Sequence, residues 1–120
     1  MSYLLPYDFV LRELYPLRPE VKKMLGCYAL VNNDKILMLL RENSDQIEYN
    51  GIFIAAQEEH LESLKAEIHS SKMQFDIDGS DTWIFLSEDL DEFEEKVKKA
   101  CVMIKSGDER IGKPLHDLSI

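Results

Sequence analysis

The stretch MLGCYALVNNDKILMLL, residues 24–40, decides how the rest of the sequence is interpreted. Two aliphatic runs without internal proline flank NNDK at positions 32–35, and Asn and Asp tolerate the positive φ angles that tight turns between strands require. This pattern predicts a β-hairpin at the centre of one sheet. Neither run alternates cleanly between apolar and polar residues, so we expect both faces to be at least partly covered. The alternative, one buried helix, is disfavoured by Gly26 and by the polar break.

Length and composition indicate one soluble globular domain. The chain has 120 residues, of which 45% are hydrophobic and 31% charged, so it can bury a core without a disulfide or a metal. Its net charge of −9 disfavours direct binding to nucleic acid and to anionic membrane surfaces. We find no secretion leader and no apolar run long enough to span a bilayer. Two cysteines make no disulfide framework, so we expect a cytoplasmic protein with reduced thiols.

Further elements are predicted on both sides of the hairpin. Residues 1–17 have near-helical apolar spacing, and Pro16 and Pro19 end that helix. Residues 20–23 are predicted to be a charged lead-in to the hairpin. Arg18, Lys22 and Lys23 form a basic cluster there, which we interpret as solvated rather than as an anion site. The remaining predictions are strands at 51–56, 72–77 and 82–87, an Asp-Gly turn at 78–81, helices at about 57–69 and 90–106, and a loose tail at 108–120.

Two of these helices have clear apolar faces. In the helix at 57–69, Leu61, Leu64 and Ile68 follow the i, i+3, i+7 spacing of a stripe that faces a sheet. The helix at 90–106 has an Asp89-x-x-Glu92 start that resembles a capping box, and a glycine follows its last turn. The sequence therefore predicts an α+β fold. We expect a single antiparallel sheet of about five strands with helices packed on it, one domain over residues 1–107 and a C-terminal tail over 108–120.

The cysteine and histidine residues offer weak candidates for chemistry. Cys27 is predicted in mid-strand among apolar neighbours, which raise a thiol pKa, so a small core residue is favoured over a nucleophile. Cys101 lies on the apolar stripe of the last helix. His60 would need a nucleophile or an acid beside it to act as a general base. His60 and His69 are nine positions apart and cannot share a metal on one helix, so no metal site is predicted.

Aromatic residues on the strands are a second group of candidates. Strand alternation places Trp83 with Phe85 on one face and Ile84 on the other. The rings of Trp83, Tyr28, Tyr49 and Phe53 could line a ligand pocket or form an exposed protein-binding face. Packing in the core is the third alternative. The acidic run around Asp78 does not fit a calcium loop, because no reading frame places its glycine and final glutamate correctly.

The segment VKKMLGCYALV at 21–31, followed by Asp34-Lys35 and a second aliphatic strand, resembles the N-terminal domain of TfoX/Sxy-type proteins. That family shows a basic residue, Met-Phe-Gly, a small residue, an aromatic-containing strand and a tight turn. The resemblance covers roughly residues 20–113 and includes NGIF at 50–53, EEH at 58–60 and DERIGK at 108–113. Leu25 replaces the family's Phe, and Cys27 stands where a small residue is usual. The chain does not include the C-terminal helical domain of full-length competence regulators.

The resemblance implies an α+β domain with one antiparallel sheet, of the class of folds seen in secretion chaperones. It implies no catalytic residue. The full-length family regulates genes for DNA uptake, but a shared fold does not fix the function.

Two functions follow as hypotheses. The first is a non-enzymatic cytoplasmic interaction domain, regulatory in role and without a cofactor, that acts through an exposed sheet face or as a homodimer. The second is a small-molecule-binding domain or an enzyme that uses the cleft between sheet and helices, with Cys27, Tyr28, His60 and Trp83 as ligand-binding residues. A concave pocket that holds two polar groups together would favour the second hypothesis.

Overall fold

In the computed structural model, which describes residues 5–24, 26–68 and 83–115, the predicted hairpin is formed by β2 (Cys27–Asn32) and β3 (Lys35–Arg41). Asn32 pairs with Lys35 across the turn. The two central residues, Asn33 and Asp34, have φ angles of 53° and 63°. These left-handed angles are those of a primed turn, whose twist matches that of the flanking strands. The hairpin is therefore confirmed, and local turn chemistry explains it.

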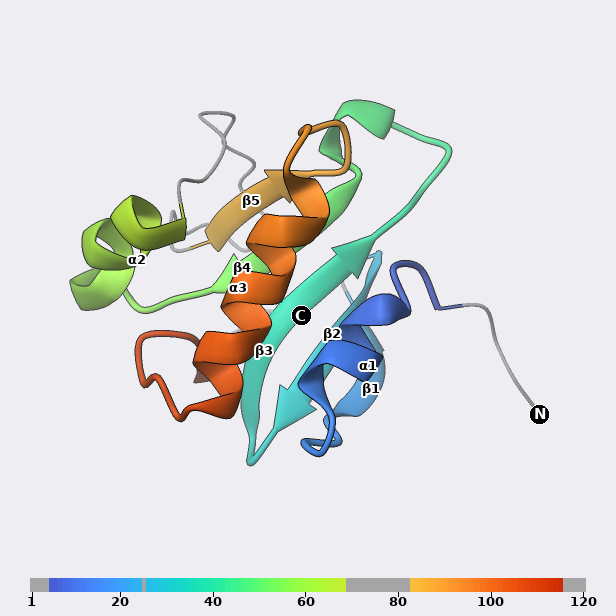
Figure 1. Ribbon diagram of the computed structural model, residues 1–120. Coiled ribbons are helices and arrows are strands. Elements are labelled where there is room, and N and C mark those ends of the chain that lie inside the picture. The colour runs from blue at the N-terminus through green and yellow to red at the C-terminus, as the bar shows by residue number, and fades with distance from the viewer. Residues whose placement is uncertain (1–4, 25, 69–82, 116–120) are drawn as a thin grey trace.

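Among the described residues, the hairpin lies inside a six-stranded antiparallel sheet with the order β1-β2-β3-β4-β5 (Figure 1). The sixth strand, β6, pairs with the start of β3. The α+β fold class is confirmed. Besides β2 and β3, the elements are α1 (Phe9–Leu14), β1 (Glu20–Met24), the 3₁₀ turn η1 (Ile47–Tyr49), β4 (Gly51–Ala55), the 3₁₀ turn η2 (Glu58–His60), α2 (Leu61–Ile68), β5 (Trp83–Ser87), α3 (Phe93–Lys105) and β6 (Lys113–Pro114).

The side chains of the sheet form two apolar clusters, one on each face. The helix-side cluster joins Leu30, Leu40 and Ile54 to residues of α1, α2 and α3, which lie on the same side of the sheet (Figure 1). The opposite cluster contains residues of the strands, with Leu115 packed at its margin; its buried members are Cys27, Ala29, Val31, Ile36, Leu39, Phe53, Ala55, Trp83 and Phe85. Both faces of β2, β3, β4 and β5 are therefore largely buried, as the lack of clean alternation in the hairpin predicts.

The helices confirm the predicted apolar stripes more closely than the predicted ends. Leu61, Leu64 and Ile68 of α2 are buried. The predicted N-terminal helix is shorter than 1–17, because the helix begins at Phe9, and Tyr7 just before it has a left-handed φ of 54°.

The capping box predicted at the start of the last helix does not form. α3 begins at Phe93, and its N-cap residue Glu92 makes no side-chain capping hydrogen bond. Residues 88–92 instead form turns, in which the N–H group of Phe93 donates to the carbonyl of Leu90. At the other end the prediction holds. Gly107 has a φ of 84°, and the N–H of Asp108 donates to the carbonyl of Met103, as expected after a left-handed C-terminal residue.

Two segments predicted without regular structure belong to the sheet. The charged lead-in at 20–23 is wrong, since Glu20–Met24 is strand β1; an edge strand can leave its polar side chains in water. The loose tail is wrong for residues 108–115. Ile111 forms a bridge with Ala56, and β6 pairs with Lys35 and Ile36, where β3 extends beyond β4. The predicted strand at 72–77 and the turn at 78–81 lie outside the described residues, as do positions 116–120.

Candidate functional site

The four residues predicted to bind a ligand lie in separate places. Cys27 and Trp83 belong to the cluster on the face opposite the helices. Tyr28 faces the other side of the sheet, where it packs partly buried against the helix-side cluster. His60 ends η2, outside the sheet. Cys27 lies on β2 at the Arg41 end of the sheet, whereas Trp83 pairs with Ala55 at the other end, three strands away. The fold therefore brings none of the four residues together.

Cys27 is held in a form that is a poor nucleophile. Cys27 is only 4% exposed. Burial raises the pKa of the thiol to about 11, and the positive charge of Arg41 opposes that shift only in part. A protonated thiol does not attack an electrophile or bind a metal at neutral pH. The position agrees with the small core residue that the sequence favours.

Trp83 has an unforeseen neighbour in Lys113. The Nζ atom of Lys113 lies 4.6 Å from the centre of the Trp83 ring, a cation–π distance, and both residues are buried. Sequence reasoning missed Lys113 because it placed this lysine in a solvated tail. The pairing with β3 is what carries the lysine to the face of the sheet that holds Trp83.

His60 lies near a polar cluster that joins α2 to the segment after α3. The Nε2 atom of His60 is 3.7 Å from Oε2 of Glu59, and the histidine side chain is 35% exposed. The hydrogen bond from Arg110 is the main cause of the lowered pKa of Asp108, and His60 adds a smaller electrostatic contribution. A partly exposed histidine beside an exposed carboxylate is ordinary surface chemistry rather than a general base poised on a nucleophile.

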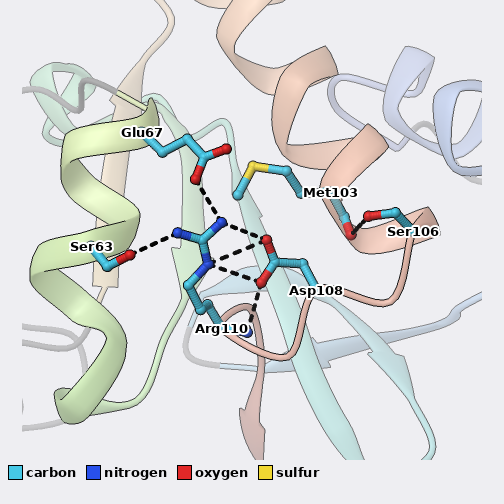
Figure 2. Close-up of polar contacts among 6 residues, drawn as sticks. All are labelled: Ser63, Glu67, Met103, Ser106, Asp108 and Arg110. Atoms are coloured by element: carbon cyan, nitrogen blue, oxygen red, sulfur yellow. Dashed lines mark hydrogen bonds and ion pairs between the residues drawn. The ribbon is translucent and has the colours of Figure 1, made fainter.

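Arg110 is the centre of this polar cluster (Figure 2). Its Nε and Nη2 atoms donate to the carboxylate of Asp108 over 3.0 and 2.7 Å. The Nη2 atom also donates to Glu67 over 2.6 Å, and Nη1 donates to the hydroxyl of Ser63 over 2.8 Å. A guanidinium engaged on all three nitrogens has little capacity left for a ligand anion. We interpret the cluster as a clasp between α2 and residues 108–110.

Arg41 makes a second clasp, which is buried at 7% exposure. Its Nη1 atom donates to Oδ1 of Asn50 over 2.8 Å and to the carbonyl of Gln46 over 3.0 Å. Its Nη2 atom donates to the carbonyl of Asp45 over 2.8 Å. These bonds satisfy a buried cation with acceptors from the loop at 42–50, which it closes against the end of β3. The sequence analysis did not identify Arg41 as the residue that organises this loop.

The described residues contain no cluster of three or more His, Cys, Asp or Glu side chains placed to hold a metal ion. Among the described helices, none combines the length and the apolar character needed to cross a bilayer.

Another exposed feature of the described residues is the outer edge of β1. This strand pairs with β2 from Glu20↔Val31 to Met24↔Cys27. Met24 and Cys27 flank a two-residue connection and so form a hydrogen-bonded pair, and bonding alternates along antiparallel strands. The backbone N–H and C=O groups of Val21 and Lys23 therefore point away from β2. Within the described residues, the backbone contacts outside the ladders include none from these two positions.

Solvent reaches this edge of the sheet. Glu20 and Lys23 are exposed, and Val21, Lys22 and Met24 are half-buried. By contrast, the residues of β4, and those of β3 after Lys35, are buried in the interior of the same sheet. Unpaired backbone groups on an accessible strand are a template on which another extended chain can form hydrogen bonds. The candidate site is therefore the β1 edge, defined as Glu20–Met24.

Comparisons of the chain with family models, with curated proteins and with solved structures found no match.

Proposed function

We propose that this protein is a non-enzymatic interaction module that binds a partner by adding an extended strand of that partner to the β1 edge. The observation that carries the proposal is the open edge itself: Val21 and Lys23 direct backbone donors and acceptors outward, and β1 is partly exposed along its length. Main-chain hydrogen bonds supply affinity in strand addition, and the alternating side chains supply selectivity.

The edge replaces the exposed sheet face as the binding surface. Trp83 and Phe85, which an open aromatic face would expose, are 7% and 3% exposed. A cytoplasmic location, and a regulatory role of the kind that the TfoX resemblance implies, belong to the same proposal. Direct contact with nucleic acid does not belong to it, because the chain carries a net charge of −9. The ligand-binding or enzyme alternative loses support because Cys27, Tyr28 and His60 do not converge.

The test uses two substitutions at one position. Val21→Pro removes an outward N–H that β2 does not use, so the β1–β2 ladder is kept while the edge loses a donor. Val21→Ala removes the side chain and keeps the N–H. Short peptides selected from a random displayed library against the full chain are then titrated into each ¹⁵N-labelled protein.

We expect the peptides to bind wild type and Val21→Ala, to shift and protect the amides of Val21 and Lys23, and to lose binding to Val21→Pro by at least about tenfold. Sedimentation of each protein without peptide shows whether a second copy supplies the strand. If it does, wild type and Val21→Ala are dimeric and only Val21→Pro is monomeric. The proposal is overturned if no peptide is selected and the chain is monomeric, or if Val21→Pro binds as wild type does.

A further inference from the structure

The β1 edge is positively charged in a strongly acidic protein. Lys22 and Lys23 lie on β1, and Arg18 lies in the segment that leads into it. The single carboxylate on the strand is that of Glu20, whereas the whole chain has 23 acidic against 14 basic residues. The side chain of Arg18 lies over the ring of Tyr15, 5.5 Å from its centre, and Tyr15 is 59% exposed. Exposed tyrosine and arginine are residue types enriched at the centres of protein interfaces.

These cations have weak partners within the described part of the chain. The Nζ atom of Lys22 is 3.9 Å from Oε2 of Glu20, at the outer limit of an ion pair, and both side chains are substantially exposed. The Nζ atom of Lys23 is 5.7 Å from the centre of the Tyr28 ring. The ion pairs formed among the described residues include neither Arg18 nor Lys23. The charge at this edge is therefore available to a partner.

The register places the two lysines on opposite faces of the sheet. Lys22 lies opposite Ala29, whose side chain belongs to the cluster away from the helices. Lys23 lies opposite Tyr28, which belongs to the helix side. Successive residues of an added strand also alternate between faces. A strand that matches both lysines therefore needs acidic residues at two neighbouring positions, with apolar residues beside Val21 and Met24.

We infer that the segment bound at the β1 edge is an extended acidic peptide of the pattern apolar-acidic-acidic-apolar. This inference rests on the proposed function and names the class of partner. Lysine on an edge strand discourages indiscriminate pairing, and the same charge selects for an acidic strand. A second copy of this chain fits less well. Antiparallel pairing of β1 with its own copy over all five residues places Lys22 opposite Lys22, and like charges directly opposite destabilise a pair.

The test compares three blocked synthetic peptides that differ only at the two central positions: Val-Glu-Glu-Val, Val-Gln-Gln-Val and Val-Lys-Lys-Val, each within the same flanking residues. Binding to the full chain is measured by NMR titration at low ionic strength. We expect the Glu peptide to bind at least about tenfold more tightly than the Lys peptide, with the Gln peptide between them, and the difference to shrink as salt is raised.

Charge reversal of the edge should invert this order. In Lys22→Glu/Lys23→Glu the Lys peptide should bind most tightly. The matched control is Lys98→Glu/Lys99→Glu on the exposed face of α3, which changes the net charge equally and should keep the wild-type order. If the reversed variant does not fold, Lys22→Gln/Lys23→Gln should remove the difference between the Glu and Lys peptides.

The outcomes separate the two proposals. Equal affinity for all three peptides, together with loss of each in Val21→Pro, overturns the acidic partner and leaves strand addition standing. The same holds for a dimer of this chain through β1. Binding that Val21→Pro does not weaken overturns both. No binding of the three peptides overturns the acidic partner, and it overturns strand addition as well if the library yields no peptide and the chain is monomeric. An inverted order in the α3 control also overturns the inference, because the preference would then follow net charge and not the edge.

Discussion

The hydroxyl group of Tyr7 donates a hydrogen bond of 2.6 Å to Oε1 of Glu88. The hydroxyl oxygen of Tyr7 also lies 3.1 Å from the carbonyl oxygen of Arg41, which is an alternative acceptor for its single proton. The ring of Tyr7 meets that of Phe93 edge to face, with 5.5 Å between centroids. Tyr7, which precedes α1, thus contacts the end of β3, the turn after β5 and the start of α3. These contacts hold Tyr7 in its left-handed backbone conformation.

Tyr7→Phe should lower the free energy of unfolding by about 1–2 kcal/mol, because it removes a hydrogen bond to a carboxylate and keeps the ring packing. Urea denaturation measures the change. Tyr15→Phe is the control, since Tyr15 is exposed, and should change stability by less than about 0.5 kcal/mol. Equal stability of Tyr7→Phe and wild type would show that the bond contributes nothing.

The pKa of Tyr7 predicts how the stability of the protein changes at alkaline pH. Burial, with help from Glu88, raises the pKa of Tyr7 above its ordinary value of 10.0. Folding therefore favours the protonated phenol, so its contribution is fully present below pH 10 and is lost as pH rises above it. We expect wild type to lose more stability than Tyr7→Phe between pH 9 and 11. Parallel pH profiles for the two proteins would contradict this.

Among the glycines of the described residues, Gly51 should be the least tolerant of substitution. Its φ is 151°, and an added Cβ would overlap the backbone carbonyl oxygen of Leu86 in the neighbouring strand β5. Gly51→Ala should cost about 3 kcal/mol or more, measured by urea denaturation. Gly107→Ala is the matched control. Its φ is 84°, but an added Cβ there meets no atom within 4 Å, so the cost should be about 1 kcal/mol.

Both cysteines should be unreactive in the folded protein. Burial raises the pKa of Cys27 to about 11 and that of Cys101 to about 12. At pH 8 both thiols are protonated and shielded, so iodoacetamide should label neither in native protein and both in urea. Mass spectrometry of digested samples assigns the sites. Rapid native labelling of Cys27 alone would return this residue to the list of chemical candidates.

Removing the guanidinium of Arg110 should change the titration of Asp108. Hydrogen bonds from Arg110 lower the pKa of that carboxyl, so the stabilisation is present above the ordinary aspartate pKa of 3.8 and is lost as pH falls. Arg110→Gln should raise the pKa of Asp108 toward 3.8, which NMR of the carboxyl carbon measures. Arg12→Gln, which alters an exposed pair with Asp8 at 3.6 Å, should leave the Asp108 titration unchanged.

Residues close in sequence account for what could be predicted at the outset. Asn33 and Asp34 adopt the turn because their side chains tolerate positive φ, and this local preference needs no distant contact. The stripe of Leu61, Leu64 and Ile68 follows from helical period alone. The burial of Cys27 followed from its apolar neighbours in the strand.

The tertiary structure decided everything that depends on distant partners. Arg110 donates a hydrogen bond to Glu67, which is 43 residues away in the sequence. Lys113 joins the sheet because β3 extends beyond the end of β4 and offers a free pairing position there. The candidate site belongs to this group. The basic cluster at Lys22 and Lys23 was visible in the sequence, but nothing local distinguishes a charged loop from a charged edge strand. Only the pairing with β2 makes Glu20–Met24 a strand and turns its unused backbone groups outward.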